Sequence, residues 1–144
     1  MIGRSGNRRI GRSVMADNGA NRRRTQLDRT QELERRTKAF AVRVVKLFQA
    51  LPKADEARVL GKQLLRSATS VAANYRAAAR ARSRAEFVAK LGIVVEEADE
   101  TVFWIELLIE TGLVPESRIA DLLDEARQLT AIFAASRHTA RSKR

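Results

Sequence analysis

Apolar residues recur at steps of three and four in four consecutive runs, and no segment alternates with a period of two. These steps place the apolar side chains on one face of an α-helix. A proline directly after Leu51 ends the first run, Ser83 and Glu86 spell a capping box before the third, and Gly112 closes it. The pattern predicts an all-α fold, most simply an antiparallel up-down four-helix bundle with short loops. The expected core positions outside the third run are Leu33, Thr37, Phe40, Val44, Leu47, Leu51, Ala57, Leu60, Leu64, Val71, Tyr75, Ala78, Ile119, Leu122, Ala126, Leu129 and Phe133.

The third run carries more apolar surface than one core-facing stripe needs. The stripe expected to face the core consists of Phe87, Leu91, Val94, Val95, Ala98, Val102, Ile105 and Ile109. A second set lies largely on the other side of the helix and consists of Ile93, Phe103, Trp104 and Leu107. Trp and Phe are enriched at protein interfaces, so this set predicts an oligomer interface. A wider core, or contact from the N-terminal segment, would also account for it.

The formal charge of +11 lies mostly at the two ends of the chain. Residues 1–29 carry +6, residues 137–144 carry +4, and residues 30–136 carry only +1. The ends have few apolar residues to bury, which predicts a disordered basic N-terminal tail over 1–29 and a basic C-terminal tail over 137–144 around a bundle at 30–136. Met15 is an alternative start, and without residues 1–14 the chain would lose four arginines.

Within the bundle, the first two helices are basic and the last two are acidic. Segments 30–53 and 54–84 carry +4 and +5, and segments 85–114 and 115–136 carry −6 and −2. Oppositely charged helices lying side by side would neutralise most of these charges.

Six cations of the second helix project within an arc of about 80° at 100° per residue, well away from its apolar face. Such a line of basic residues is typical of proteins that bind phosphate backbones. The alternative is a solvated face paired with the acids of the third helix, and the arginine-rich ends of the chain favour the polyanion. With 5% aromatic residues, base stacking is not supported. The cations are Arg58, Lys62, Arg66, Arg76, Arg80 and Arg84.

No catalytic or metal-binding constellation stands out, so we expect a protein that is not an enzyme and holds no metal or cofactor. The chain has no cysteine, and its one histidine, His138, lies in the basic C-terminal segment. The acids Glu96, Glu97, Asp99 and Glu100 point in several directions around their helix, so they are expected to pair with basic helices rather than to bind magnesium. The apolar stretch 101–109 is too short to span a bilayer and no secretory signal is present, which predicts a cytoplasmic protein.

The segment 66–112 resembles the central part of the 23S rRNA intervening-sequence proteins, a family of four-helix bundles. Its pattern is Arg-Ser-x-x-Ser-hydrophobic-x-x-Asn, then Arg-x-Ser-x-x-Glu-Phe, then an apolar helix rich in Glu. Many members have Glu-Gly after the Asn motif, where this chain has Ala77 and Ala78. The motif residues are Arg66, Ser67, Ser70, Val71, Asn74, Arg82, Ser83, Glu86 and Phe87.

The resemblance implies a ring-like homopentamer, and members of the family are encoded within inserts in bacterial 23S rRNA genes or elsewhere in genomes. Related bundles serve as accessory subunits of reverse transcriptases in diversity-generating retroelements. The leading hypothesis is therefore a homo-oligomeric bundle that binds RNA or DNA through the six cations and the tails. The alternative is a protein-protein adaptor, with a reverse transcriptase as a candidate partner.

Overall fold

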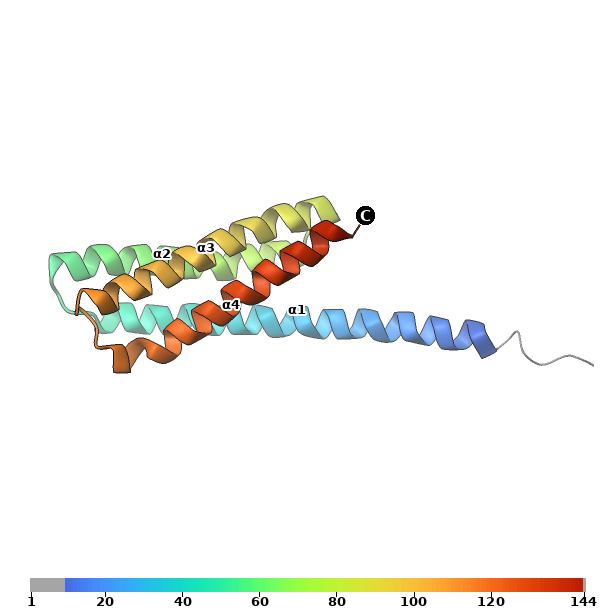
Figure 1. Ribbon diagram of the computed structural model, residues 1–144, viewed down its shortest axis with the longest axis horizontal. Helices are drawn as coiled ribbons and strands as arrows, with labels where there is room; N and C mark the ends of the chain where they lie inside the picture. The colour runs from blue at the N-terminus through green and yellow to red at the C-terminus, as the bar shows by residue number, and fades with distance from the viewer. Residues whose placement is uncertain (1–9, 144) are drawn as a thin grey trace, which may run out of the picture. The chain divides into compact units, whose positions relative to one another are not determined.

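The computed structural model describes residues 10–143, with side chains from Asp17 onward. It contains four helices: α1 (Ile10–Ala50), α2 (Asp55–Ala79), α3 (Arg84–Glu110) and α4 (Glu116–Ser142) (Figure 1). These residues divide into two compact units, the first reaching Leu33 and the second beginning at Glu34. The described residues of the first unit form the N-terminal part of α1, and the second unit is the bundle. The predicted all-α, antiparallel four-helix architecture is confirmed.

The bundle core is built from one apolar face of each helix. α4 buries all five of its predicted positions, and α2 buries all of its own except Leu60, which is half-buried. In the first predicted stripe, Thr37, Phe40 and Val44 are buried on α1. Leu33 and Leu47 on α1 and Leu51 just after it are half-buried, near the two ends of the stripe. Tyr75 and Phe133 pack their rings with centroids 5.0 Å apart, which joins α2 to α4.

Two predicted helix termini occur where expected, the first with one of the two expected capping hydrogen bonds. Ser83 is the N-cap of α3, and its hydroxyl accepts a hydrogen bond from the Glu86 N–H at 3.1 Å. The Glu86 carboxylate accepts from the Arg82 N–H at 3.3 Å, one residue before the donor expected in a capping box. Gly112 adopts φ +73°, the left-handed conformation that ends a helix with a reversal of the chain.

Helix α3 differs from its predicted core stripe. Thr101 and Leu108 are buried although neither was expected in the core. Four residues of the predicted stripe are only half-buried: Phe87, Val95, Val102 and Ile109. Apolar residues occur on all sides of this helix, so its sequence pattern does not define which face is buried.

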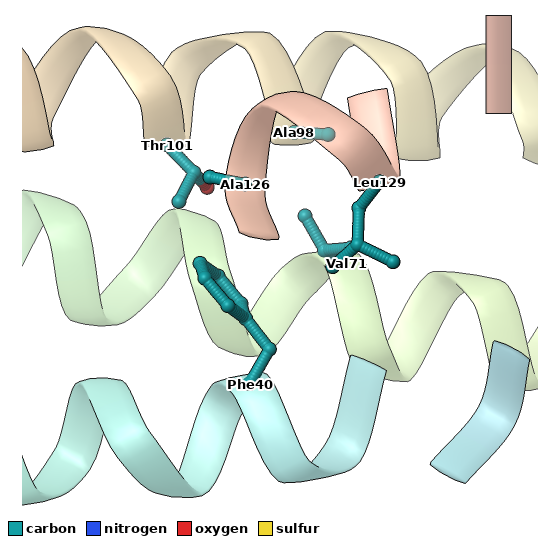
Figure 2. Close-up of a pocket in the computed structure, with 6 residues that line it drawn as sticks. All are labelled: Phe40, Val71, Ala98, Thr101, Ala126 and Leu129. Carbon is teal, nitrogen blue, oxygen red and sulfur yellow. The ribbon is translucent and has the colours of Figure 1, made fainter. Parts of the chain in front are cut away.

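Six residues from all four helices line a narrow gap at mid-bundle, which does not admit a water molecule (Figure 2). They are Phe40, Val71, Ala98, Thr101, Ala126 and Leu129.

Both predicted basic tails are largely helical rather than disordered. Residues 10–29 belong to α1, and residues 137–142 belong to α4. Arg, Ala and Gln are good helix formers, and adding residues to a helix that packing has already nucleated costs little. Residues 1–9 and 144, the remaining parts of the predicted tails, lie outside the described residues.

Candidate nucleic-acid interface

The six cations expected on one helix are all exposed, but they do not share one helix. Arg58, Lys62, Arg66 and Arg76 lie on α2, and Arg80 is its C-cap. Arg84 is the first residue of α3. A projection at 100° per residue cannot be continued through the turn at 80–83, so assigning Arg84 to the face of the second helix was wrong. Its guanidinium donates to the backbone carbonyl of Lys143, near the end of α4.

Arg66 is occupied by the acids of α3. Its guanidinium donates to Glu100 Oε1 at 2.6 Å and lies 3.6 Å from Glu97 Oε1. The hydrogen bond with Glu100, followed by the charges of Glu100 and Glu97, raises the pKa of the Arg66 guanidinium above its ordinary value. The expected pairing of basic and acidic helices is therefore confirmed at this position, and Arg66 is less available to a phosphate than its neighbours.

The other cations of α2 remain without a salt bridge. Within the described residues, neither Arg58, Lys62, Arg76 nor Arg80 lies within 4.0 Å of a carboxylate oxygen. No acidic residue occurs between Glu56 and Glu86, so the whole exposed side of α2 after its first turn lacks carboxylates of its own. Of the six predicted cations, only Arg66 is thus neutralised by carboxylates of a neighbouring helix in the part of the chain that the structure describes.

Several residues of the family-like motif have local structural roles. The hydroxyl groups of Ser67 and Thr101 lie 3.0 Å apart in the core, which connects α2 to α3. Asn74 Nδ2 donates to the Ser70 carbonyl at 2.9 Å on α2. Ser83 and Glu86 form the cap of α3, so within the described residues only Ser67 of this set makes a hydrogen bond between the two helices.

The predicted oligomer interface is only partly exposed. Ile93 and Phe103 are 43% and 54% exposed, whereas Trp104 and Leu107 are half-buried. The Trp104 indole stacks edge-on against the Phe103 ring, with centroids 4.9 Å apart, and its Nε1 donates to Glu100 Oε1 at 3.1 Å. Phe103 and Ile93 therefore form the apolar part of this face that solvent reaches.

Cations of residues 137–143, which the sequence predicts as part of a separate tail, lie close to the basic residues around the α2–α3 turn. Arg137 lies against α3: a Cβ atom built on Gly92 would be 3.0 Å from the Arg137 Cζ and Nη2 atoms. Because α4 runs back beside α3, Arg141 and Lys143 are at the same end of the bundle as the α2–α3 turn (Figure 1). The signal in the sequence was the absence of acids after Glu125, which matches the acid-free part of α2.

Comparison with known proteins defines the family. Residues 29–135 match the family model described as 23S rRNA-intervening sequence protein. The chain belongs to this family. The family segment covers α2 and α3 and most of α4, and it ends just before Arg137. A search of curated proteins gives no match.

A solved member of the S23 ribosomal protein family has the same fold. It is a protein of unknown function from Bacteroides thetaiotaomicron, with 34% sequence identity and a TM-score of 0.70. The alignment covers 76% of this chain and 97% of that one. The resemblance to 23S rRNA-intervening sequence proteins seen in segment 66–112 thus extends over the bundle. In the described residues, no helix has the length and apolar character to cross a membrane.

Proposed function

We propose that this 23S rRNA-intervening sequence protein is a non-enzymatic, homo-oligomeric bundle that binds nucleic acid, RNA in particular. The observation that carries the proposal is the exposed, acid-free side of α2, on which Arg58, Lys62, Arg76 and Arg80 have no salt bridge within the described residues. Phosphate contacts of Arg and Lys position a protein on nucleic acid and carry no base information. Binding with weak sequence preference is therefore expected.

Self-association is supported by the exposed apolar atoms of α3. Ile93 and Phe103 are large apolar side chains on a helix whose opposite side already fills the core. A homo-oligomer would cover these two side chains and repeat the α2 cations around the assembly. The family resemblance suggests that this oligomer is a pentamer. Repetition strengthens weak phosphate contacts through avidity.

RNA binding is tested by replacing Arg76, Arg80 and Arg84 with Gln together. Affinity for a labelled RNA hairpin should fall, and the slope of log affinity against log salt should decrease by about 2–3, because each lost phosphate contact removes about 0.7–0.9 from it. A matched variant replaces Lys46, Lys53 and Arg118, three exposed cations at the opposite end of the bundle. Equal affinity and slope in the first variant and the wild type would contradict the role of these arginines.

A protein-protein adaptor is the second candidate, favoured by the same exposed Phe103 and Ile93. In this case, the apolar face of α3 binds a different protein, with a polymerase such as a reverse transcriptase as the candidate. Purification of the tagged protein from its native cells with nuclease treatment separates the two functions. A polymerase retained after nuclease treatment and lost in Phe103→Ser supports the adaptor, whereas RNA recovered without a protein partner supports nucleic-acid binding.

A further inference from the structure

The charges of the bundle are separated along its axis. We define the basic end as residues 76–95 and 137–143, which comprise the end of α2, the α2–α3 turn, the first half of α3 and the end of α4. It contains eight cations and one carboxylate, that of Glu86. The cations are Arg76, Arg80, Arg82, Arg84, Lys90, Arg137, Arg141 and Lys143.

Three contacts show that these segments meet in space. Tyr75 packs on Phe133 between α2 and α4, Arg137 lies against Gly92 between α4 and α3, and Arg84 donates to the Lys143 carbonyl. Figure 1 shows the α2–α3 turn and the end of α4 at the same end of the bundle. Segments separated by more than 40 residues therefore contribute cations to one surface.

The one carboxylate of the basic end is used locally. Glu86 Oε2 accepts a hydrogen bond from the backbone N–H of Arg82 in the turn. No cation of the basic end lies within salt-bridge distance of a carboxylate in the described residues. The Nε atom of Arg137 is buried without a hydrogen-bond partner in this same part of the chain. The positive charge of the surface is thus not neutralised within the described bundle.

We infer that this basic end, rather than the length of α2, is the surface that contacts the sugar–phosphate backbone of folded RNA. The inference rests on the proposed nucleic-acid binding and specifies where it occurs. Arginine predominates in the cluster, and its planar guanidinium donates two parallel hydrogen bonds to a phosphate. Tyr75 and Phe133 are buried beneath the surface, so these rings cannot stack on bases and the contact is made with the backbone.

A structural role offers a competing explanation for some of these cations. Arg76 and Arg141 lie in the last turns of α2 and α4, where positive charge interacts favourably with the helix dipole. If this were their whole function, removing them would lower stability and leave RNA affinity unchanged. Arg82, which lies in the turn before α3, has no such helix end to stabilise.

The test compares two sets of three cations with equal charge loss. The basic-end variant carries Arg82→Gln, Arg137→Gln and Arg141→Gln, and leaves the α2 arginines in place. The control carries Lys53→Gln just before α2 and Arg58→Gln and Lys62→Gln in the first half of α2. Affinity for an RNA hairpin is measured by anisotropy over a range of salt concentrations, and thermal melting of each variant monitors folding. Because Arg137 packs on Gly92, a second variant with only Arg82→Gln and Arg141→Gln retains that contact.

The basic-end variant should lose about tenfold or more in affinity at moderate salt, and its salt slope should fall by about 2–3. The affinity of the control variant for the hairpin should fall less than about threefold, because that variant changes only the overall charge of the protein. An equal or larger loss in the control overturns the inference. If the wild type binds the hairpin and both basic-end variants bind it equally well, RNA binding stands and this location is wrong. A wild-type protein that does not bind the hairpin contradicts both.

Discussion

The two ends of the bundle have the same helical architecture and opposite electrostatic organisation. The basic end has eight cations to one carboxylate, whereas residues 43–62 and 106–127, which we call the mixed end, have seven cations and eight carboxylates. Salt bridges between helices lie at the mixed end or at mid-bundle, as in the pairs Arg66 with Glu97 and Glu100, Arg36 with Glu125, and Arg127 with Glu106. The carboxylates of the mixed end balance its cations in number, whereas the basic end has a large excess of positive charge.

This difference shows how a bundle with a basic first half and an acidic second half creates a charged surface. In the sequence, residues 30–84 are basic and residues 85–136 are acidic, which suggests neutralisation across neighbouring helices. The carboxylates of α3, however, lie mainly in its second half, and those of α4 lie in its first half. Since these halves are at the same end of the bundle, the charges separate along the axis instead of cancelling across it.

The largest expected change in the free energy of unfolding comes from core residues at the two ends of the bundle. Comparing them tests whether the basic end is as well packed as the mixed end. Phe133 is fully buried against Tyr75 beneath the basic end, and Ile119 is fully buried near the start of α4 at the mixed end. Phe133→Ala should lower the free energy of unfolding by about 3–5 kcal/mol and Ile119→Ala by about 2–5 kcal/mol. Urea denaturation measures both. A loss below about 1 kcal/mol for Phe133→Ala alone would mean that the basic end is loosely packed.

A smaller effect is expected where the two ends meet at mid-bundle. The buried Thr101 hydroxyl lies 3.0 Å from Ser67 Oγ and 2.7 Å from the Glu97 carbonyl. Thr101→Val keeps the shape and removes the hydroxyl, so it should lower the free energy of unfolding by about 1 kcal/mol. Thr69→Val is the control, because Thr69 is exposed on α2 and its change should stay within about 0.5 kcal/mol. Equal effects of the two substitutions would show that the Ser67–Thr101 contact adds no stability.

The sequence predicts most of the fold because its helix boundaries are encoded locally. The proline after Leu51, the Ser83 cap and the left-handed Gly112 each act within a few residues, and all three occur where expected. The face of α3 was less predictable, because apolar residues surround that helix and only packing selects Thr101 and Leu108 for the core. The start of α1 was also missed, since helix extension along exposed residues leaves no apolar pattern.

The candidate site was predictable in composition and not in location. The sequence identifies Arg58, Lys62, Arg76 and Arg80 as exposed cations, and the structure agrees. It cannot show that Arg137 and Arg141 come close to the α2–α3 turn, because this proximity depends on how α4 returns along α3. The pairing of Arg66 with Glu100 is likewise a tertiary contact between residues 34 positions apart.

A third prediction concerns the repulsion among cations at the basic end. Arg82→Gln combined with Lys90→Gln should raise the free energy of unfolding by about 0.5 kcal/mol at low salt, and the gain should vanish at about 0.5 M salt, where the Debye length is short. The matched pair Lys46→Gln and Lys53→Gln at the mixed end, where carboxylates outnumber cations, should give no gain. Urea denaturation at the two salt concentrations measures the effect. A gain of the same size at both ends would contradict the axial separation of charge.

The smallest expected change in the free energy of unfolding is that of Gly92→Ala, which tests whether packing fixes the position of Arg137 on α3. A Cβ atom at Gly92 would lie 3.0–3.2 Å from three atoms of the Arg137 guanidinium group, so this flexible, half-buried group must shift slightly in Gly92→Ala. Alanine also favours the helix by about 1 kcal/mol over glycine, and the two effects should leave the free energy of unfolding unchanged within about 0.5 kcal/mol. In an Arg137→Ala background the crowding disappears, so Gly92→Ala should then stabilise by about 1 kcal/mol. Equal changes in both backgrounds would mean that Arg137 moves freely and that its place on α3 is not fixed by packing.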